Sequence, residues 1–583
     1  MTRARLGLVA TVAIVAVGTL ASCAQVPDQG PVVVARERGS APPPVGQYNQ
    51  PKGPQSGDTP ADIVNGFLEA MTATPLQTTT AQQFLAGPAQ DQWQPRRVVT
   101  YTSHTAPEGN ARVRVSVRGA DQIGTRGQWR GPVAPAARHL DFPMTRENGE
   151  WRIASAPDAL IVPRSFFDQQ YEDAQIYFFD PTGQILVPEP VHVPQGSQLA
   201  SALVKALLRG PAGSLDGVER SFFPPGLSVR LSVAVDRNLA EVSLKGPDPG
   251  PLSEQTVQQM LAQLAWTLRQ DPSVSAFTLT MGNRAVTDAT GEKRFPVRSR
   301  EFESYDPAWE KATLVTYALR RGRLVSGQVN RLTKVDGPFG TKDLGIGPFA
   351  VSLDGYTVAA TGQDNLRVGP VLGDEQPVVM QSGTGLLRPA WDFAKRLWEV
   401  QNGVDGASVG YVAGGDQHNV RVRGVTGETV HRFLVSRDGS RLVAVVRGTN
   451  RDRIVVSRIR YDADGMVAGT SRAEPIGWKS RGTKRIRDIG WTSPTTIAVL
   501  DQLSQEQAEV RILNVDGSTR PGRVSPIGIR GDVPYLATSP AGQQTPYAVQ
   551  TSRSSGLALA DISPAESNRT LTIDGLRHVT YAG

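Results

Sequence analysis

A degenerate repeat in the C-terminal half constrains the fold of this chain more than any other feature of the sequence. Turns such as Ser-Arg-Asp-Gly at residues 436–439 are each followed by an apolar segment. These motifs begin at residues 351, 391, 435, 491 and 538, which are 40 to 56 residues apart. A period of roughly 40 to 50 residues, with a turn between two strands, is typical of β-propeller blades. We therefore predict that residues 305–583 form an all-β propeller of about five to seven blades, because the spacing is too irregular to fix the number.

A bacterial export and lipidation pattern occupies the N-terminus. Two arginines precede an uncharged apolar run at residues 6–20, which has the length of a signal-peptide core and is too short to span a bilayer comfortably. The run ends in Leu-Ala-Ser-Cys at residues 20–23. A leucine and two small residues before a cysteine resemble the lipobox of bacterial lipoproteins. That resemblance implies cleavage between Ser22 and Cys23, with an S-diacylglycerol and an N-acyl chain on Cys23; the alternative is an ordinary signal peptide with an incidental cysteine.

The cysteine also limits the chemistry of the rest of the chain. Cys23 is the only cysteine among 583 residues, so after lipidation no thiol remains for a disulfide or a thiolate metal site. Residues 23–57 are rich in proline, glycine and glutamine and lack apolar periodicity. This composition predicts a lipid-anchored flexible tether behind a signal peptide of residues 1–22.

The net charge of +7 comes from scattered basic residues that share segments with acids, which favours an ordinary solvated surface. Attraction to anionic lipid or to cell-wall polymers is the alternative. Export argues against nucleic acid as a partner.

The first of two small α+β domains is predicted at residues 58–168. Thr59 can cap a helix together with Asp62, and the apolar residues between positions 63 and 71 fall on one helical face. Alternating valines at residues 113–117 and a hairpin that turns at residues 148–149 predict a twisted antiparallel sheet. Helices followed by such a sheet resemble the cone-shaped fold of nuclear transport factor 2 (NTF2) and its relatives.

The second α+β domain is predicted at residues 169–304. A buried strand at residues 176–179 precedes an apolar helix face at residues 199–207, and a later helix is capped by Ser253. The run Leu-Val-Lys-Ala-Leu-Leu-Arg-Gly-Pro at residues 203–211, followed by a hairpin that ends at residues 240–244, resembles the GerMN domain. That domain occurs in exported and lipid-anchored bacterial proteins, and the resemblance implies a binding role without a general catalytic one.

The sequence predicts no enzyme, no cofactor and no metal ion. Ser408 matches the G-x-S-x-G nucleophile-elbow pattern, but no helix is expected after it, so we interpret it as a strand residue. The Asp-Ala-Asp-Gly segment at residues 462–465 lacks the remaining ligands of a calcium loop and is interpreted as a turn. Four tryptophans are assigned to packing between blades rather than to a ligand surface: Trp391, Trp398, Trp478 and Trp491. The histidines are not spaced as in zinc motifs: His104, His139, His192, His418, His431 and His578.

The order of all these segments resembles the actinobacterial LpqB lipoproteins, and the Ser-x-Asp-Gly turns resemble those of TolB-type and WD-type propellers. The family resemblance implies a lipid anchor in the cell membrane on its extracytoplasmic face. It also implies contact with the extracytoplasmic domain of an MtrB-like sensor kinase, whose response regulator is MtrA, and an effect on cell division and the cell envelope. Only Cys23 carries over residue by residue, so the partner-binding residues are unassigned.

Two other functions stay open at the level of sequence. One is a receptor for cell-wall fragments or another small ligand, which would bind at the mouth of the propeller. The other, and the least favoured, is an envelope hydrolase, for which Ser408 is the single candidate nucleophile.

Overall fold

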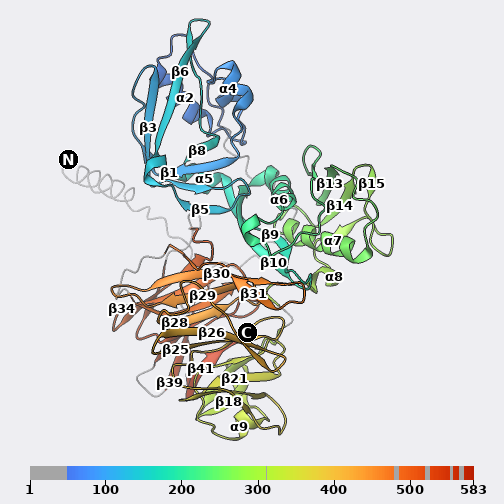
Figure 1. Ribbon diagram of the computed structural model, residues 1–583, viewed down its shortest axis with the longest axis vertical. Coiled ribbons are helices and arrows are strands. Elements are labelled where there is room, and N and C mark those ends of the chain that lie inside the picture. The colour runs from blue at the N-terminus through green and yellow to red at the C-terminus, as the bar shows by residue number, and fades with distance from the viewer. Residues whose placement is uncertain (1–48, 310–311, 478–484, 519–525, 552–555, 564–569) are drawn as a thin grey trace, which may run out of the picture. The chain divides into compact units, whose positions relative to one another are not determined.

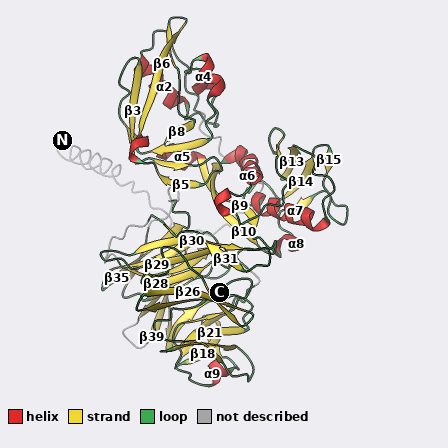
Figure 2. Cartoon of the chain, in the orientation of Figure 1, coloured by secondary structure: helices red, strands yellow, loops and turns green. Residues whose placement is uncertain are grey.

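The computed structural model describes residues 49–309, 312–477, 485–518, 526–551, 556–563 and 570–583. Within these residues the chain is multidomain and mostly β, with two small α+β domains followed by a β-propeller, as predicted (Figures 1 and 2). Ser22, Cys23 and most of the predicted tether lie outside the described residues, so cleavage and lipidation stay predictions. No helix in the described part is both long enough and apolar enough to cross a membrane.

The first domain packs short helices against two four-stranded sheets. Its helices are α2 (Pro60–Ala70), α3 (Thr79–Gln82), α4 (Gly87–Gln92) and α5 (Arg164–Gln170). One sheet has the order β5 (Trp129–Pro132), β4 (Asp121–Ile123), β1 (Arg97–Tyr101) and β8 (Ala159–Pro163). The other has the order β2 (Ser103–His104), β3 (Arg112–Arg118), β6 (His139–Glu147) and β7 (Glu150–Ile153). Helix and sheet meet in one hydrophobic core, in which the rings of Phe67 and Phe142 have centroids 6.0 Å apart.

Helix α2 begins where the sequence predicts. The Thr59 hydroxyl accepts a hydrogen bond from the Asp62 N–H at 3.2 Å, and the Asp62 carboxylate accepts one from the Thr59 N–H at 3.1 Å. This capping box satisfies N–H groups that the first turn of a helix leaves unpaired. The predicted apolar face is buried: Ile63, Val64, Phe67, Leu68 and Met71.

Strands β6 and β7 form the predicted hairpin. Asn148 and Gly149 have φ angles of 53° and 86°, the left-handed values that a two-residue type I′ turn requires. Glu150, directly after this turn, accepts hydrogen bonds from the Ser56 hydroxyl at 2.8 Å and from the Gly57 N–H at 3.1 Å. The last residues of the predicted tether therefore contact the first domain.

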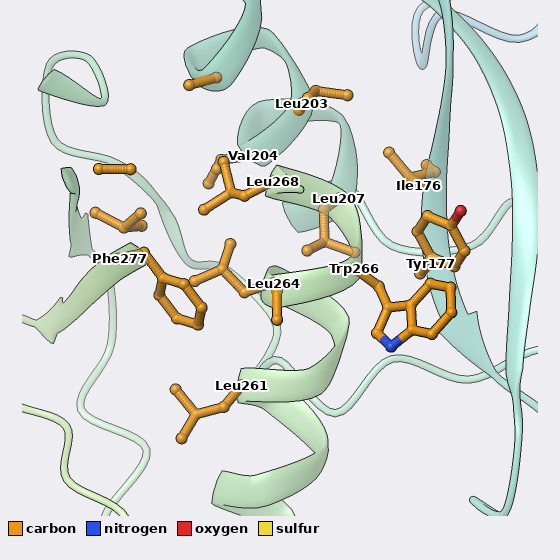
Figure 3. Packing of buried hydrophobic residues seen from close by; sticks show 14 of the residues in the cluster. Ile176, Tyr177, Leu203, Val204, Leu207, Leu261, Leu264, Trp266, Leu268 and Phe277 are labelled. Atoms are coloured by element: carbon orange, nitrogen blue, oxygen red, sulfur yellow. The ribbon is translucent and has the colours of Figure 1, made fainter. Parts of the chain in front are cut away.

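The second domain is built around one buried helix, α7 (Glu254–Leu268), which Ser253 caps by accepting from the Thr256 N–H. Leu261, Leu264 and Leu268 of α7 pack in the same core as α6 (Leu199–Leu208), as Figure 3 shows. The remaining elements are β9 (Tyr171–Phe179), β10 (Leu186–Pro194), β11 (Ser228–Val229), β12 (Ala234–Asp236), β13 (Leu239–Lys245), β14 (Ala276–Met281), β15 (Arg284–Ala285), β16 (Phe295–Pro296) and α8 (Arg300–Glu303). Strand β13 pairs with β14 in parallel, which the α7 crossover between them allows.

The described residues of the propeller form six sheets, a number within the range that the sequence left open. The strands of the first three sheets are β17 (Thr316–Arg320), β18 (Arg323–Gln328), β19 (Arg331–Lys334), β20 (Phe349–Val351), β21 (Thr357–Thr361), β22 (Asn365–Pro370), β23 (Val378–Ser382), β24 (Ala390–Trp391), β25 (Leu397–Gly403), β26 (Gly406–Ala413) and β27 (Asp416–Asn419). Those of the next three are β28 (Val430–Val435), β29 (Arg441–Val446), β30 (Arg453–Tyr461), β31 (Val467–Thr470), β32 (Glu474–Pro475), β33 (Ile486–Ser493), β34 (Thr496–Ser504), β35 (Gln507–Asn514), β36 (Ile527–Arg530), β37 (Tyr535–Ala537), β38 (Tyr547–Thr551), β39 (Gly556–Asp561) and β40 (Thr570–Asp574).

The last strand closes the propeller. Strand β41 (Leu576–Thr580) pairs antiparallel with β17, so the C-terminal end of the chain completes the first blade. A single one-turn helix, α9 (Pro338–Thr341), follows β19. Because β41 follows the last blade in the chain and pairs with the first, the two ends of the ring are joined.

Thr59→Ala is expected to destabilise α2 by about 1 kcal/mol, because the substitution removes the side-chain half of the capping box. Hydrogen exchange followed by mass spectrometry should show roughly fivefold faster exchange over residues 60–71. Thr78 precedes α3 without a side-chain capping bond, so Thr78→Ala is the matched control and should leave exchange over α3 nearly unchanged. Equal effects of the two substitutions would contradict the role given to the cap.

Candidate functional site: the propeller turns and their junction with the second domain

The repeated turns join the first strand of a blade to the second and are held by their own side chains. Between β20 and β21 the Ser352 hydroxyl donates to the Asp354 carboxylate at 2.6 Å. Between β28 and β29 the Ser436 hydroxyl donates to Asp438 at 2.7 Å and accepts from the Arg441 N–H at 3.0 Å. The repeat recognised in the sequence is therefore a structural device, because a Ser and Asp pair fixes the same turn in separate blades.

The turn between β28 and β29 also places Arg437 where several parts of the propeller meet. Its guanidinium donates to the Ala308 carbonyl at 2.6 Å, to the Ala582 carbonyl at 2.7 Å and to the Ser539 hydroxyl at 3.0 Å. Burial lowers the pKa of Arg437 to about 10, so the side chain stays charged at neutral pH. The adjacent cavity is about 50 Å³, so the end of the propeller at which this turn lies has little room for a ligand.

Arg441, the first residue of β29, belongs to a buried ionic junction with the second domain. Its side chain is fully buried, donates to the Pro188 carbonyl at 2.5 Å and contacts the Glu189 carboxylate. Arg458 of β30 binds the same carboxylate with both terminal nitrogens, at 2.6 Å and 2.8 Å. Such paired guanidinium and carboxylate contacts fix orientation as well as distance. Glu189 of β10 thus connects two neighbouring strands of the fourth blade to the second domain.

A second carboxyl group, Glu219, completes this junction. Burial by itself raises the pKa of Glu189, but Arg458 and Arg441 outweigh it and hold that pKa at about 2. Burial and the adjacent negative charge of Glu189 raise the pKa of Glu219 well above its ordinary value of 4.5. Arg458 also lies 3.7 Å from the Glu219 carboxyl group. Glu189 is therefore the carboxyl group whose ionised form the arginines stabilise most, whereas Glu219 binds a proton more readily than an ordinary glutamate.

Hydrogen bonds beside the ionic cluster extend the same junction. The Gln175 amide donates to the Thr495 hydroxyl at 2.7 Å, and Thr495 belongs to the repeat turn between β33 and β34. The Tyr461 N–H donates to the Gly217 carbonyl at 2.7 Å. These contacts place the repeat turn of the fifth blade and the end of β30 in the fourth blade against the second domain.

Arginines also gather at the opposite end of the propeller, called its mouth below, around a cavity of about 200 Å³. Arg432 lies 2.8 Å from the Asp488 carboxylate, and Arg388 donates to the Phe349 carbonyl at 3.0 Å. Burial, with the charge of Arg432, lowers the pKa of Arg388 to about 9. Burial, with Arg388 and other arginines, lowers the pKa of His578 to about 4, so this imidazole is neutral at pH 7.

The structure does not bring the residues singled out in the sequence together. Ser408 lies exposed inside β26, where its hydroxyl donates to the Gln401 carbonyl at 3.4 Å, and strand β27 follows rather than a helix. Asp462 accepts from the N–H groups of Asp464 and Met466, so this segment is the predicted turn. Trp391, Trp398 and Trp491 are buried in the propeller, whereas Trp478 lies outside the described residues.

That the protein binds no metal ion stays a prediction, and the structure bears only on the described part of the chain. There, no group of three or more His, Cys, Asp or Glu side chains could hold a metal ion. Of the histidines, His192 is buried and lies 2.7 Å from Asp173, a pairing that no sequence motif indicates.

The junction residues were missed at the level of sequence. Arg441 does leave a signal, because it opens Arg-Leu-Val-Ala-Val-Val, a strand whose six residues are all buried. Glu189 likewise stands between prolines in a largely buried strand. A charge inside an otherwise buried strand indicates a paired charge, since an unpaired one is costly to bury. The sequence cannot say which partner it meets.

Comparison with protein families covers all three domains. A model of the N-terminal domain of lipoprotein LpqB matches residues 53–168, and a model of the lipoprotein LpqB β-propeller domain matches residues 322–552. Between them, a model described as sporulation and spore germination matches residues 175–287. The chain belongs to the LpqB lipoprotein family. The resemblance found in the sequence is thereby confirmed.

Relatives named lipoprotein LpqB match most of the chain at low identity. Lipoprotein LpqB of Thermobifida fusca is 28% identical over 504 residues, which cover 76% of this chain and 79% of the relative. Lipoprotein LpqB of Streptomyces coelicolor is 27% identical over 79% of this chain and 80% of its own. Lipoprotein LpqB of Mycobacterium ulcerans is 24% identical, with 90% and 94% of the two chains covered.

Glu189→Gln is expected to destabilise the protein by about 3 kcal/mol, because it removes the carboxylate that the buried Arg441 and Arg458 side chains contact most closely. Glu219→Gln is the matched control and should cost less than about 1 kcal/mol, because the raised pKa of Glu219 already favours its neutral form. Urea denaturation at pH 7 measures the effect of each substitution as a change in the free energy of the first unfolding transition.

The pH dependence provides a second measurement of the same ion pair. The pKa of Glu189 is depressed in the folded state, so its stabilising effect is present above its ordinary value of 4.5 and is lost as the pH falls toward 2. The difference between the wild type and Glu189→Gln should therefore shrink below pH 4.5. A difference that is constant over this range would argue against an ionised Glu189.

Proposed function

We propose that this protein is a membrane-anchored lipoprotein on the extracytoplasmic face that binds the extracytoplasmic domain of an MtrB-like sensor histidine kinase. In this way it modulates signalling that affects cell division and envelope homeostasis. It acts by binding and not as an enzyme. Membership of the LpqB family and the lipobox that ends at Cys23 support the proposal. A lipid-modified cysteine with an added N-acyl chain supplies the two signals that stable anchoring requires.

Exposed apolar side chains of the second blade, here called the apolar patch, support the binding proposal. Nine large hydrophobic side chains of the described residues are exposed, and four of them belong to this blade: Tyr356, Leu372, Val378 and Val379. Between 48% and 70% of their surface is accessible. Exposed apolar side chains that gather in one place are typical of protein interaction sites, whereas scattered ones are normal.

The position of the patch suits the approach of another protein. The Val371 N–H donates to the Tyr356 carbonyl at 2.8 Å, which joins Tyr356 to the segment that leads to Leu372. Val378 and Val379 lie on β23, the last strand in the order of its sheet. The outer edge of such a strand offers backbone donors and acceptors in addition to apolar side chains.

A membrane anchor makes modest affinity sufficient. Confinement of the lipoprotein and the kinase to one membrane surface raises the concentration of each near the other. The buried ionic junction fixes the second domain on the propeller, so less conformational entropy is lost when a partner binds.

The alternative functions receive less support. A receptor that binds cell-wall fragments at the propeller mouth would use the cavity of about 200 Å³, which is smaller than the roughly 300 to 1,000 Å³ of typical ligand sites. An envelope hydrolase would use Ser408, which lies inside a regular strand rather than at the sharp turn of a nucleophile elbow.

Substitution of the apolar patch should weaken kinase binding. Leu372→Asp together with Val378→Asp is expected to reduce crosslinking to the kinase ectodomain in intact membranes by at least about tenfold, because a charge would be buried in the interface. Leu231→Asp together with Val404→Asp is the control, since these residues are also apolar, are even more exposed and lie outside the patch. Both variants should unfold at the wild-type temperature. Undiminished crosslinking by the patch variant would refute the assignment of this surface.

The lipid anchor has its own prediction. Cys23→Ala should release the protein from the membrane fraction and reduce kinase-dependent signalling, because the effective concentration of the two proteins falls. Cell fractionation and a reporter of the kinase pathway measure the two effects. Normal signalling by the released protein would count against anchoring as a requirement.

A further inference from the structure

A cavity of about 430 Å³ between residues of the first and second domains has an unbalanced charge. Five basic side chains line it: Arg96, Arg97, Arg126, Lys205 and Arg209. No Asp or Glu side chain lines it. None of the five forms an ion pair with another described residue. The arginines at the propeller junction, by contrast, are neutralised by Glu189.

Three elements bring these basic groups together. Arg96 and Arg97 lie at the start of β1, and Arg126 lies in the turn between β4 and β5. Lys205 and Arg209 are four residues apart at the C-terminal end of α6, so they lie on one face of that helix. Residues from two domains therefore converge on a single cavity.

The turn that carries Arg126 is held firmly against the second domain. The His192 N–H of β10 donates to the Gly127 carbonyl at 2.7 Å, and Arg209 donates to the Thr125 carbonyl. Gly127 has a φ angle of 81°, and a Cβ atom at this position would lie only 2.9 Å from the His192 carbonyl. Only glycine permits this close approach, which fixes Arg126 at the cavity.

The basic groups are poorly satisfied by the protein itself. The Nε atom of Arg126 is buried and has no hydrogen-bond partner among the described residues. Burial, and then the neighbouring charges of Arg126 and Arg96, lower the pKa of Arg209. Positive charges held close together repel each other, and a bound anion would relieve that repulsion.

We infer that this cavity binds an anionic ligand whose phosphate groups lie among Arg126, Arg209 and the neighbouring basic side chains. The planar guanidinium group presents donors in the geometry that phosphate oxygens accept. The cavity volume lies within the range of small-ligand sites, roughly 300 to 1,000 Å³. Five positive charges favour a ligand with at least two negative charges. The inference does not rest on the proposed function, because the cavity and the apolar patch share no residue.

Isothermal titration calorimetry tests the inference on the mature chain, residues 23–583, with Cys23→Ala so that no acyl chain interferes. Pyrophosphate is the soluble probe. Vesicles of phosphatidylcholine with and without phosphatidylglycerol are the lipid probe. We expect saturable binding that weakens as salt is added, and Arg126→Gln with Arg209→Gln should weaken it at least about tenfold.

Two further variants make the result specific. Arg230→Gln with Lys245→Gln removes the same charge from exposed positions of the second domain outside the cavity, and should change binding less than twofold. Arg97→Gln with Lys205→Gln covers the case in which loss of the Arg209 hydrogen bond unfolds the protein. Neither of those side chains donates a hydrogen bond to the described residues, so this variant should fold and still lose binding.

The outcomes separate the sources of the phosphate group. Pyrophosphate binding that the cavity variants abolish supports a free phosphate-bearing ligand. Binding to phosphatidylglycerol vesicles alone, abolished by the same variants, supports a lipid headgroup as the source. Binding of neither probe, or equal weakening by the cavity and control variants, overturns the inference.

Discussion

A carboxylate buried between two arginines connects the second domain to the propeller. Glu189 reaches Arg458 through two hydrogen bonds of 2.6 Å and 2.8 Å and also contacts Arg441, whose side chain is fully buried. Each of these charges would be costly to bury alone. The contact between the second domain and the fourth blade is therefore stable only when all three charged side chains are present. Burial and the charge of Glu189 raise the pKa of Glu219 within this set, because a second negative charge there would be unfavourable.

The repeat turns consequently have two functions in the structure. In every blade where Ser and Asp occur together, their hydrogen bonds fix the reversal between the first two strands. In the fourth and fifth blades the same turns also supply contacts to the second domain. Under the proposed binding role, a partner would contact a surface away from these turns, such as the exposed edge of the second blade.

Charge balance distinguishes structural arginines from those available to a ligand. At the junction, Arg441 and Arg458 share a carboxylate, and at the propeller mouth Arg432 is paired with Asp488. In the cavity lined by Arg126 and Arg209, no carboxylate is present among the lining residues. An anion from solution would supply the counter-charge that the chain itself supplies at the other two places.

The sequence by itself determined the class of each domain, because local signals decide it. The capping pair Thr59 and Asp62, the turn at Asn148 and Gly149, and the recurring Ser-x-Asp-Gly turns act over a few residues and have the predicted effects in the structure. Only the tertiary structure decided the number of sheets in the described propeller, the partner of Glu189 and the convergence of Arg126 with Arg209. Those properties depend on contacts between residues that are far apart in the chain, such as Glu189 and Arg458. Sequence periodicity carries no information about such distances, because it reports which face of an element is buried and not what that face meets.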